Sequence, residues 1–196
     1  MPIFPSSGFP PSCGGGDPQG LTAPPAAADW TLSAGSMTDA VGGGVVWTVA
    51  AATDKTARIS APGIVGVIAR IRAAPFGPYF DRWQVGLGKS GTNEWCAMGG
   101  FNPNHTWGLY GNAGGFTGSA FDFTARSSAY FYWAKVQIIA SVIHFYESID
   151  GTTWNEVGAT VGMGTALPNG ADQYCLVGYN SNAGTSQLWC DSIVAF

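Results

Sequence analysis

The sequence predicts an all-β protein, a sandwich of short antiparallel strands, and three observations carry that prediction. Apolar and polar residues alternate with a period of two within residues 129–160, which is typical of strands with one buried face. The 29 glycines and 12 prolines suit many turns between short strands. No apolar period of three to four residues lasts long enough to predict more than a turn or two of helix.

Residues 129–160 are predicted to form three consecutive strands, with a glycine-bearing turn before the third. On the first strand, Val136 falls on one side, and Trp133, Lys135 and Gln137 fall on the other. On the second strand, Ile143 and Phe145 alternate with Val142, His144 and Tyr146. Asp150-Gly151 then supplies residue types that tolerate a positive φ, so we expect a hairpin turn and a returning strand through Trp154 and Val157.

The run FYESIDGTTWNEVG (145–158) resembles paired strands of the concanavalin A-like lectin/glucanase superfamily, particularly its laminin G-like branch. Residues 79–100 are similar to a strand-turn-strand of that family, and residues 173–196 resemble its closing pair of strands. The resemblance covers residues 28–196. It implies an antiparallel jelly-roll β-sandwich, concanavalin A-like, and leaves the activity open.

Residues 1–28 differ in composition from the rest, since proline alternates there with Gly, Ser and Ala and almost no charge is present. We expect an extended N-terminal arm over 1–28 and the sandwich domain over 29–196. One interpretation is a frayed terminus or linker. The other is an assembly arm whose Ile3, Phe4 and Phe9 become buried against another subunit. Such leaders also resemble the start of bacteriophage fibre and decoration subunits.

Composition limits the partners. A net charge of −4 with eight Lys and Arg argues against nucleic acid. The charged fraction of 10% suits a surface that packs against protein or polar sugar. No secretory signal or membrane span is recognisable, so we expect synthesis in a host cytoplasm and no membrane partner. Arg70 and Arg72 share a strand face and could hold a carboxylate or a phosphate, but we interpret that face as an exposed one with two solvated cations.

No cofactor or metal site is predicted. The cysteines at 13, 96, 175 and 190 lack metal-ligand spacing, and reduced, half-buried thiols are expected, although Cys175 and Cys190 could be neighbours. No D-x-D-x-D-G loop is present, and Asn93, Glu94, Asp150 and Asp172 are calcium candidates only because they flank turns.

No catalytic residues are predicted either. The E-x-D-x-x-E spacing that sandwich-fold glucanases carry on one strand is absent, although distant carboxylates could still converge. His144 points away from Glu147 on its own strand, and His105 lies in a loop or at a strand edge, so neither favours a catalytic dyad.

The remaining candidate ligand surface is aromatic. A sugar packs its apolar face on an aromatic ring, and amide or hydroxyl groups of the protein form hydrogen bonds at the edges of the sugar. The candidate carbohydrate-binding residues are Trp83, Trp107, Trp133, Tyr146 and Asn180. Trp30, Trp47 and Trp189 are better explained as core or subunit contacts.

These observations favour a non-enzymatic, virion-associated structural or adhesion protein, such as a phage capsid decoration or tail-fibre subunit. Its arm would bind other virion or assembly subunits, its sandwich would meet a cell-surface glycan, and it would form a homo-oligomer. The alternatives are a free carbohydrate-binding lectin module and, third, a divergent glycoside hydrolase.

Overall fold

The computed structural model describes residues 26–41, 43–49, 55–73, 82–91, 94–101, 105–112, 115–122, 132–148, 150–157, 161–162, 173–180 and 186–196. Within these ranges the chain is almost entirely β, and the one helix is the short 3-10 turn η1 (Ala27–Asp29). No helix of the described residues is long and apolar enough to cross a membrane. The predicted all-β class is confirmed.

In the described part of the chain, one sheet has seven strands, all antiparallel to their neighbours. In spatial order they are β1 (Thr31–Leu32), β4 (Lys55–Ser60), β14 (Gln173–Asn180), β6 (Arg82–Lys89), β7 (Glu94–Phe101), β8 (His105–Asn112) and β9 (Gly115–Asp122).

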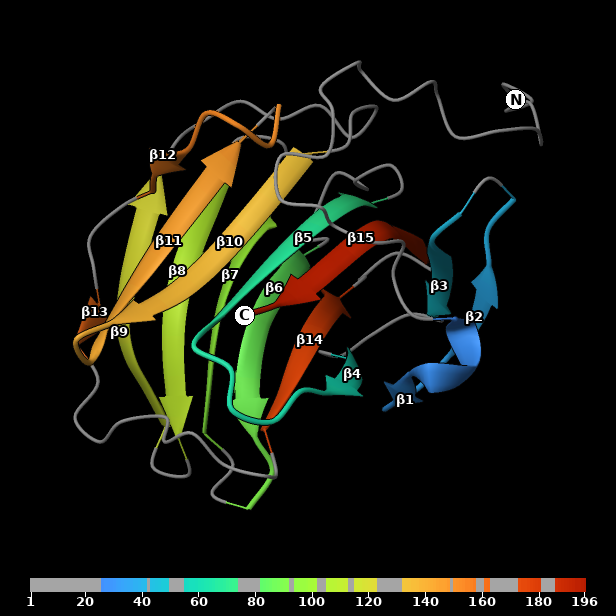
Figure 1. Cartoon of the computed structure of the whole chain (residues 1–196), viewed down its shortest axis with the longest axis horizontal. Coiled ribbons are helices and arrows are strands. Elements are labelled where there is room, and N and C mark those ends of the chain that lie inside the picture. Colours follow the sequence, from blue (N-terminus) through green and yellow to red (C-terminus); the bar gives the residue numbers. More distant parts are fainter. Residues whose placement is uncertain are drawn as a thin grey trace.

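The second sheet has eight strands and is also antiparallel. Its order is β12 (Asn155–Glu156), β11 (Val142–Ser148), β10 (Tyr132–Ile139), β5 (Gly66–Ala73), β15 (Ser186–Ala195), β3 (Val45–Val49) and β2 (Ser36–Asp39), with β13 (Val161–Gly162) pairing to β11 off this path. In Figure 1 the central strands of this sheet cross in front of β6, β7 and β14, and the two sheets form a sandwich.

The strands predicted within 129–160 are present as β10, β11 and β12, and the strand-turn-strand of 79–100 is present as β6 and β7. The closing pair of strands over 173–196 is present as β14 and β15. β14 belongs to the seven-stranded sheet and β15 to the eight-stranded sheet, so the chain crosses the sandwich between them. Both strands present buried thiols, Cys175 and Cys190, to the space between the sheets.

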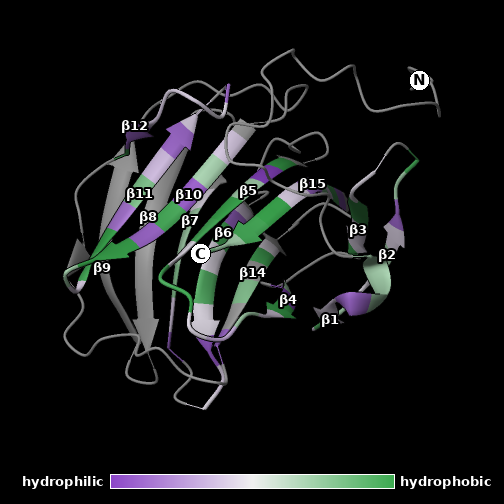
Figure 2. Cartoon of the chain, in the orientation of Figure 1, coloured by the Kyte–Doolittle hydropathy of each residue, from purple (hydrophilic) through white to green (hydrophobic). Residues whose placement is uncertain are grey.

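The core lies between the sheets and follows the alternation that the sequence predicts. On β10 and β11 the inward residues Val136, Ile143 and Phe145 are at most 1% exposed. Their neighbours Lys135 and Tyr146 are half-buried on the opposite face. Figure 2 shows the same pattern as alternating hydrophilic and hydrophobic bands along both strands. Burial of the apolar side stabilises the sheet packing, at roughly 25 cal/mol per Å² of apolar surface removed from water.

Two turns fix the register of the β10–β11–β12 region. The first contains only Ala140 and Ser141, with φ of 48° and 65°, as a tight two-residue hairpin requires. The second contains Gly151, whose φ of 73° confirms the predicted Asp-Gly turn. Because a slip by one residue would exchange the two faces, these turns decide which side chains reach the surface.

The arm residues Ile3, Phe4 and Phe9, together with Cys13, Asn93 and Asp172, lie outside the described residues.

Candidate functional site

The outer face of β10 and β11 places polar and aromatic side chains in a regular grid. The hairpin register sets Lys135 opposite Tyr146 and Gln137 opposite His144. All four residues share one face, because residues two apart on a strand point the same way. Each is half-buried, which leaves part of every side chain accessible.

β12 extends this grid at the edge of the sheet. Its Glu156 pairs in register with Tyr146, so a carboxylate joins the same face. The connecting turn is held by Asp150, whose Oδ1 accepts hydrogen bonds from the backbone N–H groups of Thr152 and Thr153 at 2.8 and 2.7 Å. These bonds, with a further one from the Ser148 hydroxyl, hold the pKa of the Asp150 carboxyl well below its usual range.

Lys135 lies against two aromatic rings. Its ammonium nitrogen is 4.1 Å from the centroid of the Tyr146 ring and 4.6 Å from that of the Trp154 ring. Both distances are within the range in which a ring attracts a cation electrostatically. Partial burial lowers the pKa of Lys135 below its ordinary value, because desolvation disfavours the charged form.

His144 connects the aromatic part of the face to its carboxylate. Its ring stacks beside that of Tyr146 with an interplanar angle of 11° and a centroid separation of 6.2 Å. Its Nδ1 lies 2.7 Å from Oε1 of Glu156, so the carboxylate orients the imidazole. Burial first, and the charge of Glu156 second, raise the pKa of the Tyr146 phenol, which keeps that hydroxyl protonated at neutral pH.

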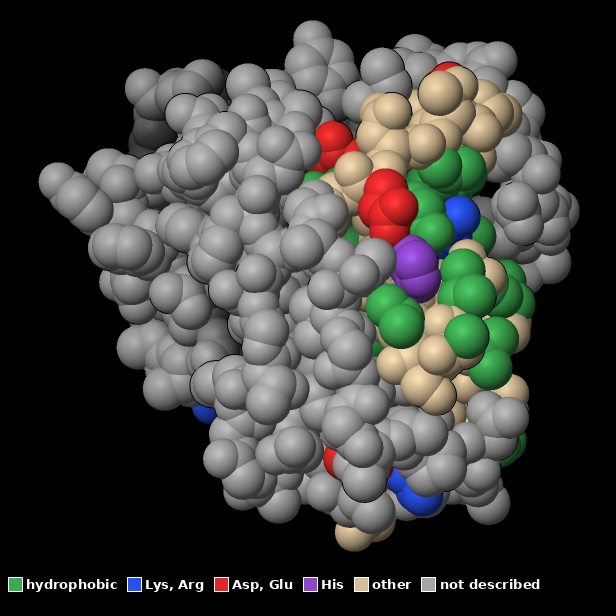
Figure 3. All heavy atoms as spheres, turned by 90° about the vertical axis from the view of Figure 1, so that its left-hand side faces the viewer, with side chains coloured by type: hydrophobic (Ala, Val, Ile, Leu, Met, Phe, Trp, Pro, Cys, Tyr) green, Lys and Arg blue, Asp and Glu red, His purple; other side chains and the backbone are tan. Residues whose placement is uncertain are grey.

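We call this surface the outer platform. It consists of Lys135, Gln137, His144, Tyr146, Trp154 and Glu156. On the side of the molecule that carries β11 and β12, Figure 3 shows a histidine among hydrophobic side chains, with acidic side chains next to it. The platform therefore offers rings for apolar contact and amide, imidazole, ammonium and carboxylate groups for hydrogen bonds.

Of the five predicted carbohydrate-binding residues, Tyr146 belongs to the platform. Trp133 precedes it on the same face of β10, as the sequence indicates, but its side chain is only 8% exposed. The guanidinium carbon of Arg70 lies 5.8 Å from the centroid of the Trp133 ring, and Arg70 also pairs with Asp191 at 2.9 Å. The interpretation of Arg70 as a solvated cation is therefore wrong.

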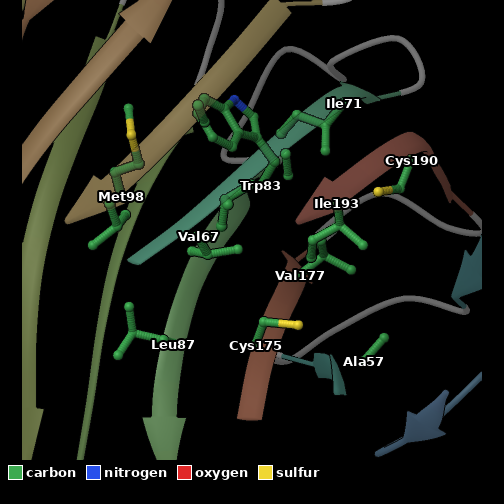
Figure 4. Close-up of a cluster of buried hydrophobic side chains, with 14 of the residues drawn as sticks. Ala57, Val67, Ile71, Trp83, Leu87, Met98, Cys175, Val177, Cys190 and Ile193 are labelled. Carbon is green, nitrogen blue, oxygen red and sulfur yellow. The ribbon is translucent and has the colours of Figure 1, made fainter. Parts of the chain in front are cut away.

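Trp83 lies in the core. Its side chain is 2% exposed and points between the sheets, near Ile71 in Figure 4. From that position it cannot contact a ligand at the surface, so it is left out of the site. Trp107 and Asn180 lie on β8 and β14, but their side chains are outside the described part of the chain.

Trp154 and the pairing of His144 with Glu156 were not predicted. On its own strand His144 has only Glu147 nearby, and that carboxylate does face the other way, into the sandwich. The position of Glu156 opposite Tyr146 could have been predicted from the Asp150-Gly151 turn. Tyr146 and Glu156 are equidistant from Gly151, so a hairpin centred on that glycine sets them opposite each other.

The three cysteine side chains that the structure describes offer no reactive group to the platform. Cys96, Cys175 and Cys190 are free thiols, and all three are buried instead of half-buried as expected. Burial raises the pKa of Cys175 to about 11 and raises that of Cys96 further, so both remain protonated. Among the described residues, no group of three or more His, Cys, Asp or Glu side chains could hold a metal ion.

No protein-family model matches the sequence, and no curated protein is significantly similar to it. Solved structures do match its fold. A functionally unknown protein from Saccharomyces cerevisiae superposes with a TM-score of 0.65 at 11% identity, over 88% of this chain and 99% of that one. The carbohydrate-binding module CBM66 from Bacillus subtilis gives a TM-score of 0.59 at 11% identity, over 84% and 93%. The β-glucanase of Bacillus licheniformis gives 0.61 at 10% identity, over 85% and 90%.

This is a concanavalin A-like jelly-roll β-sandwich. The fold that the resemblance implied is thereby confirmed. At these identities the likeness shows the fold alone, and none of these three structures links the chain to a phage.

The expectation that the chain is not an enzyme is overturned by these neighbours. Besides the β-glucanase they include a transglycosylase solved in complex with NAG, a glycosidic hydrolase and an alginate lyase, at 10 to 14% identity. The fold is therefore capable of catalysis. The physical reason for the error is that the E-x-D-x-x-E spacing concerns carboxylates on one strand only, whereas the contact of His144 on β11 with Glu156 on β12 shows that titratable groups from two strands meet.

Proposed function

We propose that the protein binds glycans and that the outer platform is the binding surface. The observation that carries this proposal is the placement of Tyr146 and Trp154 as half-buried rings on one sheet face, directly beside Gln137 and the His144–Glu156 pair. Sugar recognition needs this combination, because the apolar face of a pyranose packs on a ring and its hydroxyls need hydrogen-bond partners at the edge. A carbohydrate-binding module is among the proteins of the same fold.

The test is a glycan array probed with the wild type and with Tyr146→Ala and Trp154→Ala. Loss of a stacking ring is expected to weaken binding at least about tenfold, which is roughly 1.4 kcal/mol. Trp189→Ala is the matched control, since Trp189 is a half-buried tryptophan on β15, two strands away from β10 in the same sheet. Trp133→Ala is unsuitable, because removal of a buried ring disturbs packing. Equal binding by all three variants would contradict the proposal.

A second candidate function is acid–base catalysis on the bound glycan. It is favoured by the 2.7 Å contact of His144 with Glu156, because a histidine oriented by a carboxylate is a typical general base. The check is an assay of new reducing ends in the glycan that the array identifies. His144→Ala should abolish any cleavage, and intact glycan with the wild type would remove this candidate.

The finer role, as a virion decoration or tail-fibre subunit that displays this surface, is supported by the composition of residues 1–28. Ile3, Phe4 and Phe9 then bury themselves against neighbouring subunits of a homo-oligomer or a larger particle, and the virion is the location of the protein. Light scattering of the full chain beside a variant lacking residues 1–28 tests this. An assembled full chain and a folded, monomeric truncated chain are expected, and the same oligomeric state for both would contradict it.

A further inference from the structure

We propose that the ligand of the outer platform is an acidic glycan, a sugar that carries its carboxylate directly on the pyranose ring, and that this carboxylate binds Lys135. The inference rests on the proposed function, because it names the class of glycan for the same surface.

Lys135 contacts aromatic rings and has no acidic partner among the described residues. Its ammonium is held by the faces of Tyr146 and Trp154, at 4.1 and 4.6 Å from their centroids. No carboxylate among the described residues lies within ion-pair distance of it. A partly desolvated cation that rests on aromatic rings still gains from an anion, since charge-assisted hydrogen bonds are shorter and stronger than neutral ones.

The one carboxylate on the platform has a different partner. Glu156 is directed at His144, at 2.7 Å between Oε1 and Nδ1. The acid of the platform is therefore engaged by the imidazole, and Lys135 keeps its hydrogen-bond donors for a ligand. This arrangement separates a positive corner, at Lys135, from a corner at His144–Glu156 that can exchange hydrogen bonds with hydroxyls.

Arg70 shows by contrast what a satisfied cation on this face looks like. Like Lys135 it contacts a ring, with 5.8 Å between its guanidinium carbon and the Trp133 centroid. Unlike Lys135 it has a protein carboxylate, that of Asp191 at 2.9 Å. Two aromatic-bound cations lie on neighbouring strands of one face, and at Lys135 the ligand supplies the carboxylate that Asp191 supplies to Arg70.

The geometry restricts the ligand further. The ammonium lies against the same rings on which a sugar stacks, so the carboxylate must be attached close to the pyranose ring to reach it. Uronic and sialic acids meet this condition. A long polyanion does not fit, because the protein has a net charge of −4 and its negative electrostatic field repels a ligand that carries many negative charges.

Calorimetric titration tests the inference with the disaccharides of galacturonic acid and of mannuronic acid and with a sialylated trisaccharide. Each is compared with its carboxyl-reduced, neutral counterpart, at low and at high salt. The wild type is expected to bind at least one acid form about tenfold more tightly than its neutral form, which is roughly 1.4 kcal/mol. This preference should shrink at high salt, because screening weakens an accessible ion pair.

Lys135→Met keeps most of the side-chain volume and removes the charge, so it should abolish the preference for the acid form. Lys135→Arg should retain it. Lys55→Met, on β4 of the other sheet, removes a half-buried lysine elsewhere and should change nothing. Circular dichroism of each variant verifies that the sandwich is folded.

The outcomes distinguish this inference from the proposed function. If the wild type binds acid and neutral forms equally, the acidic-ligand inference is overturned and glycan binding stands. An acid preference that survives in Lys135→Met also overturns it. If no acid or neutral form of any probe binds, while the array likewise detects no glycan, both proposals fail.

Discussion

The two faces of the β10–β11 hairpin are built from alternate residues of the same two strands, yet they have different physical roles. Inward, Val136, Ile143 and Phe145 are at most 1% exposed and pack in the core. Outward, Lys135 and Tyr146 are half-buried and contact each other through a cation and a ring. One hairpin can therefore supply stability on one face and recognition on the other.

The largest expected loss of stability comes from a substitution on the inner face. Phe145→Ala should lower the free energy of unfolding by about 3–5 kcal/mol, because it removes buried apolar surface and leaves a cavity. Its neighbour Tyr146→Ala, on the outer face, should cost about 1 kcal/mol while weakening glycan binding. Denaturant unfolding of both variants measures the contrast. Equal losses of stability would mean that the two faces do not differ as described.

A second change should raise stability without touching either face. Ser141 adopts a φ of 65° in the β10–β11 turn, a conformation that costs a non-glycine residue energy. Ser141→Gly should therefore increase the free energy of unfolding by about 1 kcal/mol. Glycan affinity should stay at the wild-type value. An affinity change as large as the stability change would show that the turn is part of the binding surface.

A third, smaller effect concerns His144 and Glu156 on the outer face. Their side chains are 22% and 44% exposed, so solvent screens the interaction. A double-mutant cycle with His144→Ala and Glu156→Gln should give a coupling energy of about 0.5 kcal/mol in stability. The same cycle measured on glycan binding should give the larger coupling. A coupling confined to stability would assign the pair to the fold.

The smallest expected effect is a pH dependence at the Asp150 turn. The pKa of Asp150 is lowered in the folded chain by hydrogen bonds from Thr153, Thr152 and Ser148. Because the folded-state pKa is the lower one, the carboxylate contributes its full stabilisation when the pH is above the pKa that Asp150 has in the unfolded chain. This contribution is lost as the pH falls through the folded-state pKa. Asp150→Asn keeps an acceptor and loses the charge.

The variant should therefore be less stable than the wild type near neutral pH, and the difference should shrink on acidification. Urea unfolding at several pH values measures it. A difference that grows towards acid pH would contradict the sign.

The sequence predicted the parts of this molecule that depend on short-range pattern. The alternation along β10 and β11 has a period of two, so the pattern alone put Val136 on the inward face and Lys135 on the outer one, and it separated Phe145 from Tyr146. The Asp150-Gly151 turn was recognisable for the same reason, because glycine tolerates the φ of 73° that the turn requires.

What the sequence could not supply depends on contacts between distant segments. Arg70 is paired because β15 brings Asp191 beside β5, and Trp133 is buried on a face that alternation alone marks as wet. Trp83 illustrates the same limit, since a tryptophan suitable for sugar stacking is equally suitable for a core. The platform itself needed the register across Gly151, which sets Glu156 opposite Tyr146.

Whether recognition belongs to the outer face can be decided by an NMR titration that follows the indole N–H resonances of the tryptophans. The probe is the glycan that binds most tightly on the array. The Trp154 resonance should shift with added glycan, whereas the resonance of buried Trp47, which donates to the Ala34 carbonyl at 2.9 Å, should stay in place. Glycan binding with an unmoved Trp154 resonance would mean that the sugar is recognised elsewhere on the molecule.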